Sequence, residues 1–346
     1  MTPSSTSSLK KVTLPLFFKH WKIVIISAIC VALLASVLIY QKSKSKAVIL
    51  FGTLGGWSSK AVDINNAGQV IGDYRNENGD IRAFLWTKES GMQDLGTLGG
   101  RSSYVAGIDE NGQVYGSADN PPNSPQSSSR FRWTKEKGME ERTDSSSEID
   151  RRSRYSISQG TEDESVPTIY YNKKRFVLNN LGGKKGSAYP PNDKGQATGN
   201  SEIENGDEHS FFWSQEQGML DIGTLGGRKT HANYINNHGQ IVGYSLTKNG
   251  EKRAFIWSRD KGIRELETLA GKESEAVVIN DSGEIVGYIK HSPPWWVGPW
   301  GWIAQQLKLS YKYKPSLKYK DLKEAVLWRV PPDPDLKQFP TTPEKQ

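Results

Sequence analysis

The sequence predicts an all-β repeat domain, because three landmarks recur along it in a fixed order. The first is a turn of the form INxxGQ, whose glycine returns roughly every 44 residues. The second is a short aromatic stretch that ends in tryptophan, and the third is a TLGG segment. A repeat of about 44 residues is typical of a unit with four short strands. Outside one apolar segment near the N-terminus, no window has helical periodicity.

The turn glycines define the number of repeats. They stand at Gly68, Gly112, Gly195, Gly239 and Gly283. Successive intervals are 44 residues except the second, which is 83 and indicates one decayed copy. Residues 149–157 (IDRRSRYSI) fit that copy, with Ser153 in the glycine position. The sequence therefore contains six copies.

The aromatic stretch follows each turn in register. It ends at Trp86, Trp133, Trp213, Trp257 and Trp328, and at Tyr171 in the decayed copy. TLGG occupies 53–56, 97–100 and 224–227, with variants at 180–183 and 268–271. We expect these tryptophans to pack between neighbouring sheets and the turn glycines to be structural, because Gly tolerates the positive φ that tight turns need.

Each copy is consistent with four strands separated by turns. In the first copy the expected strands are 61–64, 69–74, 82–87 and 92–98. Residues 48–56 (VILFGTLGG) look like the end of a repeat, whereas the last copy lacks a good fourth strand after Trp328. The first strand is thus expected to complete the last sheet, which removes an exposed edge. This arrangement predicts a six-bladed β-propeller-like domain over residues 48–330, whereas an open solenoid would need capping repeats.

Residues 23–40 predict a single transmembrane helix that precedes the repeat domain. These eighteen residues carry no charge and span roughly 27 Å as a helix, close to the thickness of a bilayer core. A cleaved signal peptide is the alternative, but its apolar region is usually shorter. Residues 1–22 form the expected cytoplasmic, basic N-terminus, and 41–47 form a linker. The repeat domain is then expected in the periplasm or at the cell exterior, with 331–346 as a Pro-rich tail.

The charge distribution argues against nucleic acid as a partner. Residues 1–46 hold seven lysines and no acidic residue. The remaining 300 residues hold 38 basic and 38 acidic residues, so the net charge of +7 comes from the flanks of the apolar segment. A nucleic-acid-binding domain is instead expected to carry its basic residues on the folded part.

The sequence offers no catalytic or cofactor motif. It has no nucleophile elbow, P-loop or dinucleotide fingerprint. Five histidines without metal-ligand spacing and a single cysteine, Cys30, predict no metal centre and no disulfide. Asp109, Asn111 and Asp281 lie in loops too short for a calcium site of the helix–loop–helix kind. We therefore expect no metal, no cofactor and no enzyme activity.

The pattern INxxGQVVGxS, RAFLW and GMxDLGTLGG resembles the HAF family of bacterial extracellular repeat proteins. The resemblance covers about residues 48–290 and 324–328, and it is weakest in the third copy. Arg82-Ala83-Phe84 and Arg253-Ala254-Phe255 have arginine where the family's tripeptide has histidine, and His209-Ser210-Phe211 changes the alanine. The resemblance implies an exported β-rich repeat protein and supplies no catalytic residues.

Two insertions interrupt the repeats. Residues 117–130 are polar and rich in Pro and Ser, which is typical of a loop without chemistry. Residues 291–320 concentrate aromatic and basic side chains, and the candidate binding residues there are Trp295, Trp296, Trp300, Trp302, Tyr311 and Tyr313. Such residues dominate binding hot spots, although the tryptophans could equally pack on a neighbouring blade or meet the membrane surface.

The most consistent function is a non-catalytic interaction scaffold at the cell envelope. The membrane is its first partner, through residues 23–40, and the second is an unknown envelope protein or glycan. The alternatives are a propeller enzyme with a cluster of acids or histidines in its central funnel, and a carbohydrate-binding protein. The enzyme requires that cluster in the funnel, whereas the carbohydrate-binding protein would use the tryptophans of 291–320, with rings spaced for stacking on sugars.

Overall fold

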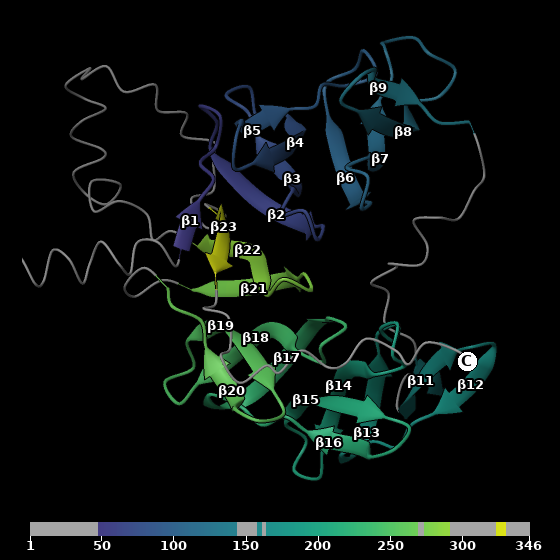
Figure 1. The fold of residues 1–346 in the computed structure, drawn as a ribbon, viewed down its shortest axis with the longest axis vertical. Helices are drawn as coiled ribbons and strands as arrows, with labels where there is room; N and C mark the ends of the chain where they lie inside the picture. The colour runs from purple at the N-terminus through teal and green to yellow at the C-terminus, as the bar shows by residue number, and fades with distance from the viewer. Residues whose placement is uncertain (1–47, 144–157, 161–163, 269–272, 291–322, 330–346) are drawn as a thin grey trace, which may run out of the picture. The chain divides into compact units, whose positions relative to one another are not determined.

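The computed structural model describes residues 48–143, 158–160, 164–268, 273–290 and 323–329. Within these ranges every helix or strand element is a β-strand, which confirms the all-β prediction (Figure 1). No helix there is long and apolar enough to cross a membrane. The predicted anchor at 23–40 and its flanks lie outside the described residues, as do 331–346.

The first two repeats each form an antiparallel sheet of four strands in chain order. The first sheet contains β2 (Ser58–Ile64), β3 (Val70–Arg75), β4 (Ile81–Thr87) and β5 (Gly91–Asp94). The second contains β6 (Ser103–Ile108), β7 (Val114–Asp119), β8 (Ser128–Thr134) and β9 (Gly138–Glu141). Because β7 and β8 extend into the predicted loop at 117–130, the connection between them is residues 120–127.

The third repeat has three described strands: β10 (Ser158–Gly160), β11 (Ser165–Tyr171) and β12 (Lys174–Val177). They pair antiparallel in chain order. Strand β11 ends at Tyr171, where the other repeats have tryptophan. The decayed turn with Ser153 lies outside the described residues.

The fourth and fifth repeats each form four strands. They are β13 (Gly182–Ala188), β14 (Ala197–Ile203), β15 (Glu208–Ser214) and β16 (Gly218–Asp221), then β17 (Gly226–Ile235), β18 (Ile241–Thr247), β19 (Lys252–Ser258) and β20 (Gly262–Glu265). One parallel pair, Glu208 with Lys229, joins the two units into an eight-stranded sheet.

The last sheet combines both ends of the repeat domain. It contains β21 (Ser274–Ile279), β22 (Glu284–Lys290), β23 (Lys323–Arg329) and β1 (Val48–Leu50). Strand β1 pairs antiparallel with β23, so that Val48 lies opposite Trp328 and Leu50 opposite Val326 (Figure 1). This confirms the prediction that the first strand completes the last sheet, and β1 covers the edge that β23 would otherwise expose.

Two glycines in five of the six repeats have different roles. The turn glycine, Gly68 in the first repeat, has φ of 74°, which L side chains rarely adopt. The glycine of the second strand, Gly72, permits a close approach: a Cβ there would lie 2.1 Å from the Lys60 carbonyl oxygen and 2.5 Å from the Phe84 ring. The turn pattern predicts the first role, whereas the second depends on how closely the neighbouring strand and ring approach.

Three of the repeat tryptophans contact aromatic side chains from another repeat. The ring of Trp86 lies 4.7 Å from that of Phe51, which follows β1. Trp257 of the fifth repeat lies 5.5 Å from Phe212 of the fourth, measured between ring centroids. Trp213 of the fourth lies 5.6 Å from Phe176 of the third. These contacts bury large apolar rings between repeats, where truncation to Ala typically costs about 3–5 kcal/mol.

Candidate functional site

The INxxGQ turns form a continuous hydrogen-bonded row, here named the amide ladder. Its members are Asn192, Asn236, Asn280, Asn65 and Asp109, one from each of five repeats. The Nδ2 atom of each asparagine donates to the backbone oxygen of the next member, at distances of 2.8, 3.1, 3.0 and 3.0 Å in that order. Asp109 has no amide nitrogen on its side chain, so it donates no further bond and the row ends in the second repeat.

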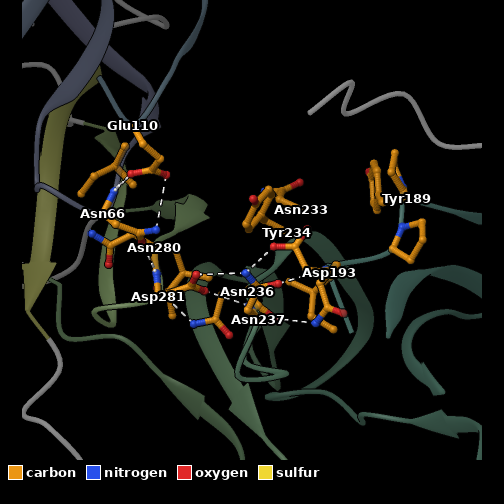
Figure 2. A pocket seen from close by; sticks show the side chains of 16 residues that line it. Asn66, Glu110, Tyr189, Asp193, Asn233, Tyr234, Asn236, Asn237, Asn280 and Asp281 are labelled. Carbon is orange, nitrogen blue, oxygen red and sulfur yellow. Dashed lines mark hydrogen bonds between the residues drawn. The ribbon is translucent and has the colours of Figure 1, made fainter. Parts of the chain in front are cut away.

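A second row runs beside the first, one residue later in each turn. The backbone N–H of Asp193 donates to Asn237 Oδ1 at 3.0 Å. The series continues through Asp281 and Asn66 and ends on Glu110 Oε2, at 2.9 Å for each bond. Figure 2 shows these side chains along one side of a cavity. The turns therefore tie neighbouring repeats together by side chains, in addition to the strand pairing within each sheet.

The cavity beside the ladder has a volume of about 520 Å³. Asn233, Tyr234 and Tyr189, which precede the turns, line it together with Pro190 and Pro191 (Figure 2). The sixteen described residues that line it include three carboxylates, Glu110, Asp193 and Asp281, and no Lys, Arg or His. The cavity wall thus has aromatic, proline and amide surfaces, and the three carboxylates give part of it a negative charge.

A second group of side chains lies on the strands of three repeats, farther along these strands from the INxxGQ turns. We name it the charged aromatic cluster, and its members are Glu208, Lys229, His231, Tyr244, Lys252, Glu275, Tyr288 and Lys323. All are at least partly accessible except Tyr288, which is buried. They come from the fourth, fifth and sixth repeats.

One half of the cluster centres on Glu208. Its carboxylate contacts His231 Nδ1 at 3.0 Å and Lys229 Nζ at 3.1 Å. The other imidazole nitrogen, Nε2, lies 3.3 Å from the Tyr189 hydroxyl, which joins the cluster to the cavity. The carboxylate favours the proton on Nδ1, so in the neutral imidazole Nε2 accepts from Tyr189.

The other half centres on Glu275. Lys252 Nζ lies 2.5 Å from its carboxylate, and the Tyr288 hydroxyl donates to the same oxygen. The second carboxylate oxygen accepts from Asn233 Nδ2 at 3.0 Å, which is a further link to the cavity. An acid in the fourth repeat thus contacts a base in the fifth, and a base in the fifth contacts an acid in the sixth.

Rings and cations alternate through the cluster. The imidazole of His231 stacks on Tyr244 at 5.3 Å and 19°. Lys252 Nζ lies 3.8 Å above Tyr244 and 6.0 Å from Tyr288, and Lys323 Nζ lies 4.0 Å from Tyr288. Cation–π contacts of this kind are worth about 0.5–2 kcal/mol each, depending on burial.

The environment holds the carboxylates charged and the phenols neutral. Burial alone would raise the pKa of Glu208, but hydrogen bonds from His231 and Lys229 outweigh it and lower that pKa. The pKa of Glu275 is lowered in the same way, with burial outweighed by Lys252 and Tyr288. Burial raises the pKa of Tyr189 and of Tyr244. Neither carboxyl is thereby prepared as a general acid, nor is either phenol prepared as a base.

The cluster occupies positions at which the side chains differ between repeats. His231 lies opposite Tyr244 in the strand register, and Glu275 lies opposite Tyr288. The corresponding pairs in other repeats are Lys60 with Asp73, Tyr104 with Ser117 and Ser187 with Asn200. The backbone pairing is therefore constant while the side chains change. Comparison of the aligned repeats position by position would reveal this variation. The landmarks that define the repeat lie instead at positions where the residues agree.

The candidate residues of the second insertion, Trp295, Trp296, Trp300, Trp302, Tyr311 and Tyr313, lie outside the described residues. The repeat tryptophans lie in strands, and the turn glycines lie in the ladder turns. Within the described ranges, no group of three or more His, Cys, Asp or Glu side chains could hold a metal ion.

Comparison with known proteins gives no family for the chain. No family model matches, and no curated protein matches. Among solved structures, the β-propeller domain of the Trilobed protease from Pyrococcus furiosus is similar at a TM-score of 0.31 and 11% identity, over 65% of this chain and 75% of that one. TolB from Acinetobacter baumannii gives 0.25 and 9%, over 67% and 50%. An acylaminoacyl peptidase from Pyrococcus horikoshii gives 0.31 and 11%, over 66% and 42%. This chain spans half or less of the last two, and similarity at this level assigns no activity.

Proposed function

We propose that the chain is a membrane-anchored, extracytoplasmic repeat protein, a six-bladed β-propeller of the HAF type, that acts as a non-catalytic binding scaffold at the cell envelope. The closure of the last sheet by β1 and the ladder through five repeats support the propeller. The apolar segment 23–40 supports the anchor.

The observation that carries the binding role is the contrast between constant and varied positions. Repeats that share one backbone register differ at the positions of the charged aromatic cluster. In a repeat protein, constant positions maintain the frame, and side chains that vary on one face can determine what that face binds. The cluster is therefore the proposed contact face, and the tryptophan-rich insertion at 291–320 is a second one.

Substitutions taken from the protein's own repeats test this role. A variant with His231→Ser, Tyr244→Ser and Lys252→Ser carries residues that other repeats have at those positions. Full-length protein is cross-linked in native membranes, and captured partners are quantified. We expect at least a tenfold loss of capture in this variant and full capture in a Tyr104→Ser control, which alters an exposed residue of the second repeat. Equal capture by all three folded proteins would refute the contact face.

One observation favours an enzyme as the second candidate. Glu208, His231 and Tyr189 are connected by two successive hydrogen bonds, which is the order of groups in a proton relay. The raised pKa of Tyr189 counts against a phenolate nucleophile. Chemical analysis of the captured material decides the point, because an enzyme would alter it at a rate that falls in a Glu208→Gln variant, whereas a scaffold would return it unchanged.

A further inference from the structure

The cavity beside the amide ladder excludes anionic ligands by its charge. Among the residues that the structure describes, three carboxylates and no cationic side chain line it. The carboxylates are already bonded within the turns: Asp281 accepts two bonds from Asn237, and Glu110 accepts two from Asn66. Asp193 accepts a bond from Asn237 Nδ2 at 2.8 Å. With these lone pairs engaged, the carboxylates do not converge as a cation cage.

Two polar atoms beside the cavity can act as hydrogen-bond acceptors. Asn233 uses its Nδ2 twice, donating to Glu275 Oε1 and to the Ala276 carbonyl at 2.8 Å, which leaves its Oδ1 outside these two bonds. The Tyr189 hydroxyl directs its proton to His231, and one lone pair of its oxygen accepts from Asn200, so one further lone pair can still accept. Groups that present acceptors in this way select a ligand that donates hydrogen bonds.

The apolar part of the wall has flat surfaces. Tyr189, Tyr234, Pro190 and Pro191 contribute rings to it. Flat apolar surfaces beside hydrogen-bonding groups match a pyranose, which has C–H faces and a rim of hydroxyls. The volume of about 520 Å³ lies within the range of roughly 300–1,000 Å³ found for small-molecule sites.

We infer that this cavity binds a neutral saccharide unit, with the Tyr189 oxygen and Asn233 Oδ1 as hydrogen-bond acceptors for its hydroxyls. The inference rests on the proposed function, because it requires binding without turnover. It assigns a ligand class to the cavity, which is separate from the contact face formed by the charged aromatic cluster.

Titration calorimetry with the full-length protein tests the inference. The probes are glucose, galactose and N-acetylglucosamine, with glucuronate as the anionic and protonated glucosamine as the cationic analogue. At least one neutral sugar should bind, and glucuronate should bind at least tenfold more weakly than glucose. Absence of binding by every neutral sugar, or tenfold tighter binding of glucosamine than of glucose, would overturn the inference.

Two phenol variants locate the site. Tyr189→Phe should weaken binding of the neutral sugar about fivefold to tenfold, the usual effect of one lost hydrogen bond. Tyr74→Phe is the matched control: its hydroxyl donates to Asp94 at 2.6 Å, and it does not line the cavity. Equal affinity of the two variants would place the sugar elsewhere and contradict the assignment.

Two further measurements keep the outcomes separate. If Tyr189→Phe does not fold, saturation-transfer NMR on the wild type replaces it, with transfer expected at the sugar C–H protons and its absence counting against the site. Mass spectrometry of the recovered sugar reports turnover. Chemically altered sugar would reject the scaffold function while retaining the saccharide class, and lost sugar binding with intact partner capture would reject the inference alone.

Discussion

The two ends of the first strand of each repeat differ in how much their side chains vary between repeats: the end that leads into the INxxGQ turn is nearly constant, and the opposite end varies. At the turn end, four asparagines repeat the same bond to the next repeat. At the other end, the register position held by His231 is Glu, Lys, Tyr or Ser in other repeats. The difference teaches that the frame is maintained at one end of each strand, which leaves the other end able to change its side chains.

The largest effect is expected at the centre of the ladder. Asn236→Ala removes the donor to the Asn280 carbonyl and the acceptor of the Gln240 N–H, both buried or half-buried. Unpaired buried groups of this kind cost about 1–3 kcal/mol each, so we expect a loss of about 3 kcal/mol in the free energy of unfolding, measured with denaturant. The control is Asn78→Ala, an exposed turn residue, which should change stability by less than about 0.5 kcal/mol. Similar losses in both variants would remove the distinction between the ends.

A stabilising change is expected at Asp73. Burial raises its pKa to about 6, despite the bond from the Val105 N–H and the nearby Lys60. Because the folded pKa is raised, ionisation costs stability as the pH rises from the unfolded pKa through 6. The equivalent Asn200 makes the same kind of bond, to the Ala232 N–H at 2.9 Å. Asp73→Asn should therefore add about 1–2 kcal/mol at pH 8 and little at pH 4, measured as the difference in unfolding free energy. A gain that does not depend on pH would contradict the assigned cause.

A smaller and opposite pH dependence is expected at Glu275. Its folded pKa is lowered, so its contribution is complete above the unfolded pKa and is lost as the pH falls through the folded pKa. Glu275→Gln should cost about 1 kcal/mol at pH 7, because Lys252 and Tyr288 lose a charged partner. The wild type and the variant should converge in acid denaturation experiments near pH 3. A gap that persists there would show that the loss comes from packing.

The smallest effect on stability is expected at His231. His231→Ser places in the fifth repeat the residue that Ser187 provides in the fourth, at a half-buried position. The stability should fall by less than about 1 kcal/mol in thermal unfolding, while partner capture falls strongly. A loss as large as that of Asn236→Ala would mean that the cluster also maintains the frame.

The sequence was sufficient for much of the frame. Spacing of the turn glycines predicted the repeats, and the residual strand at 48–50 predicted the closure with β23. The fourth strand of the first repeat is expected at 92–98 and lies at Gly91–Asp94. The Leu95 N–H still donates to the Ala83 carbonyl, and the chain then leaves the sheet. Such ends depend on tertiary contacts that a local pattern does not contain.

The candidate site was less accessible to sequence reasoning. Glu208 and His231 are 23 residues apart, and Lys252 and Glu275 are separated by the same interval. Neither pair forms a recognisable motif, because the contact arises only where one repeat packs on the next. The ladder was closer to prediction, because the INxxGQ turns are a landmark of the repeat and their asparagines bond within the same turn, as from Asn65 to Gln69. Their second bond, across to the next repeat, required the arrangement of the sheets.

The pairing of β1 with β23 has a consequence for the synthesis of the chain. Val48 leaves the ribosome early, yet its partner Trp328 is made 280 residues later. At roughly 5–20 residues per second, β1 waits about fifteen seconds to a minute for its sheet. During that interval β2 to β5 can form the first sheet, but β1 has no strand with which to pair. A nascent chain arrested before residue 323 should therefore leave β1 open to proteolysis, and release of the finished chain should protect it.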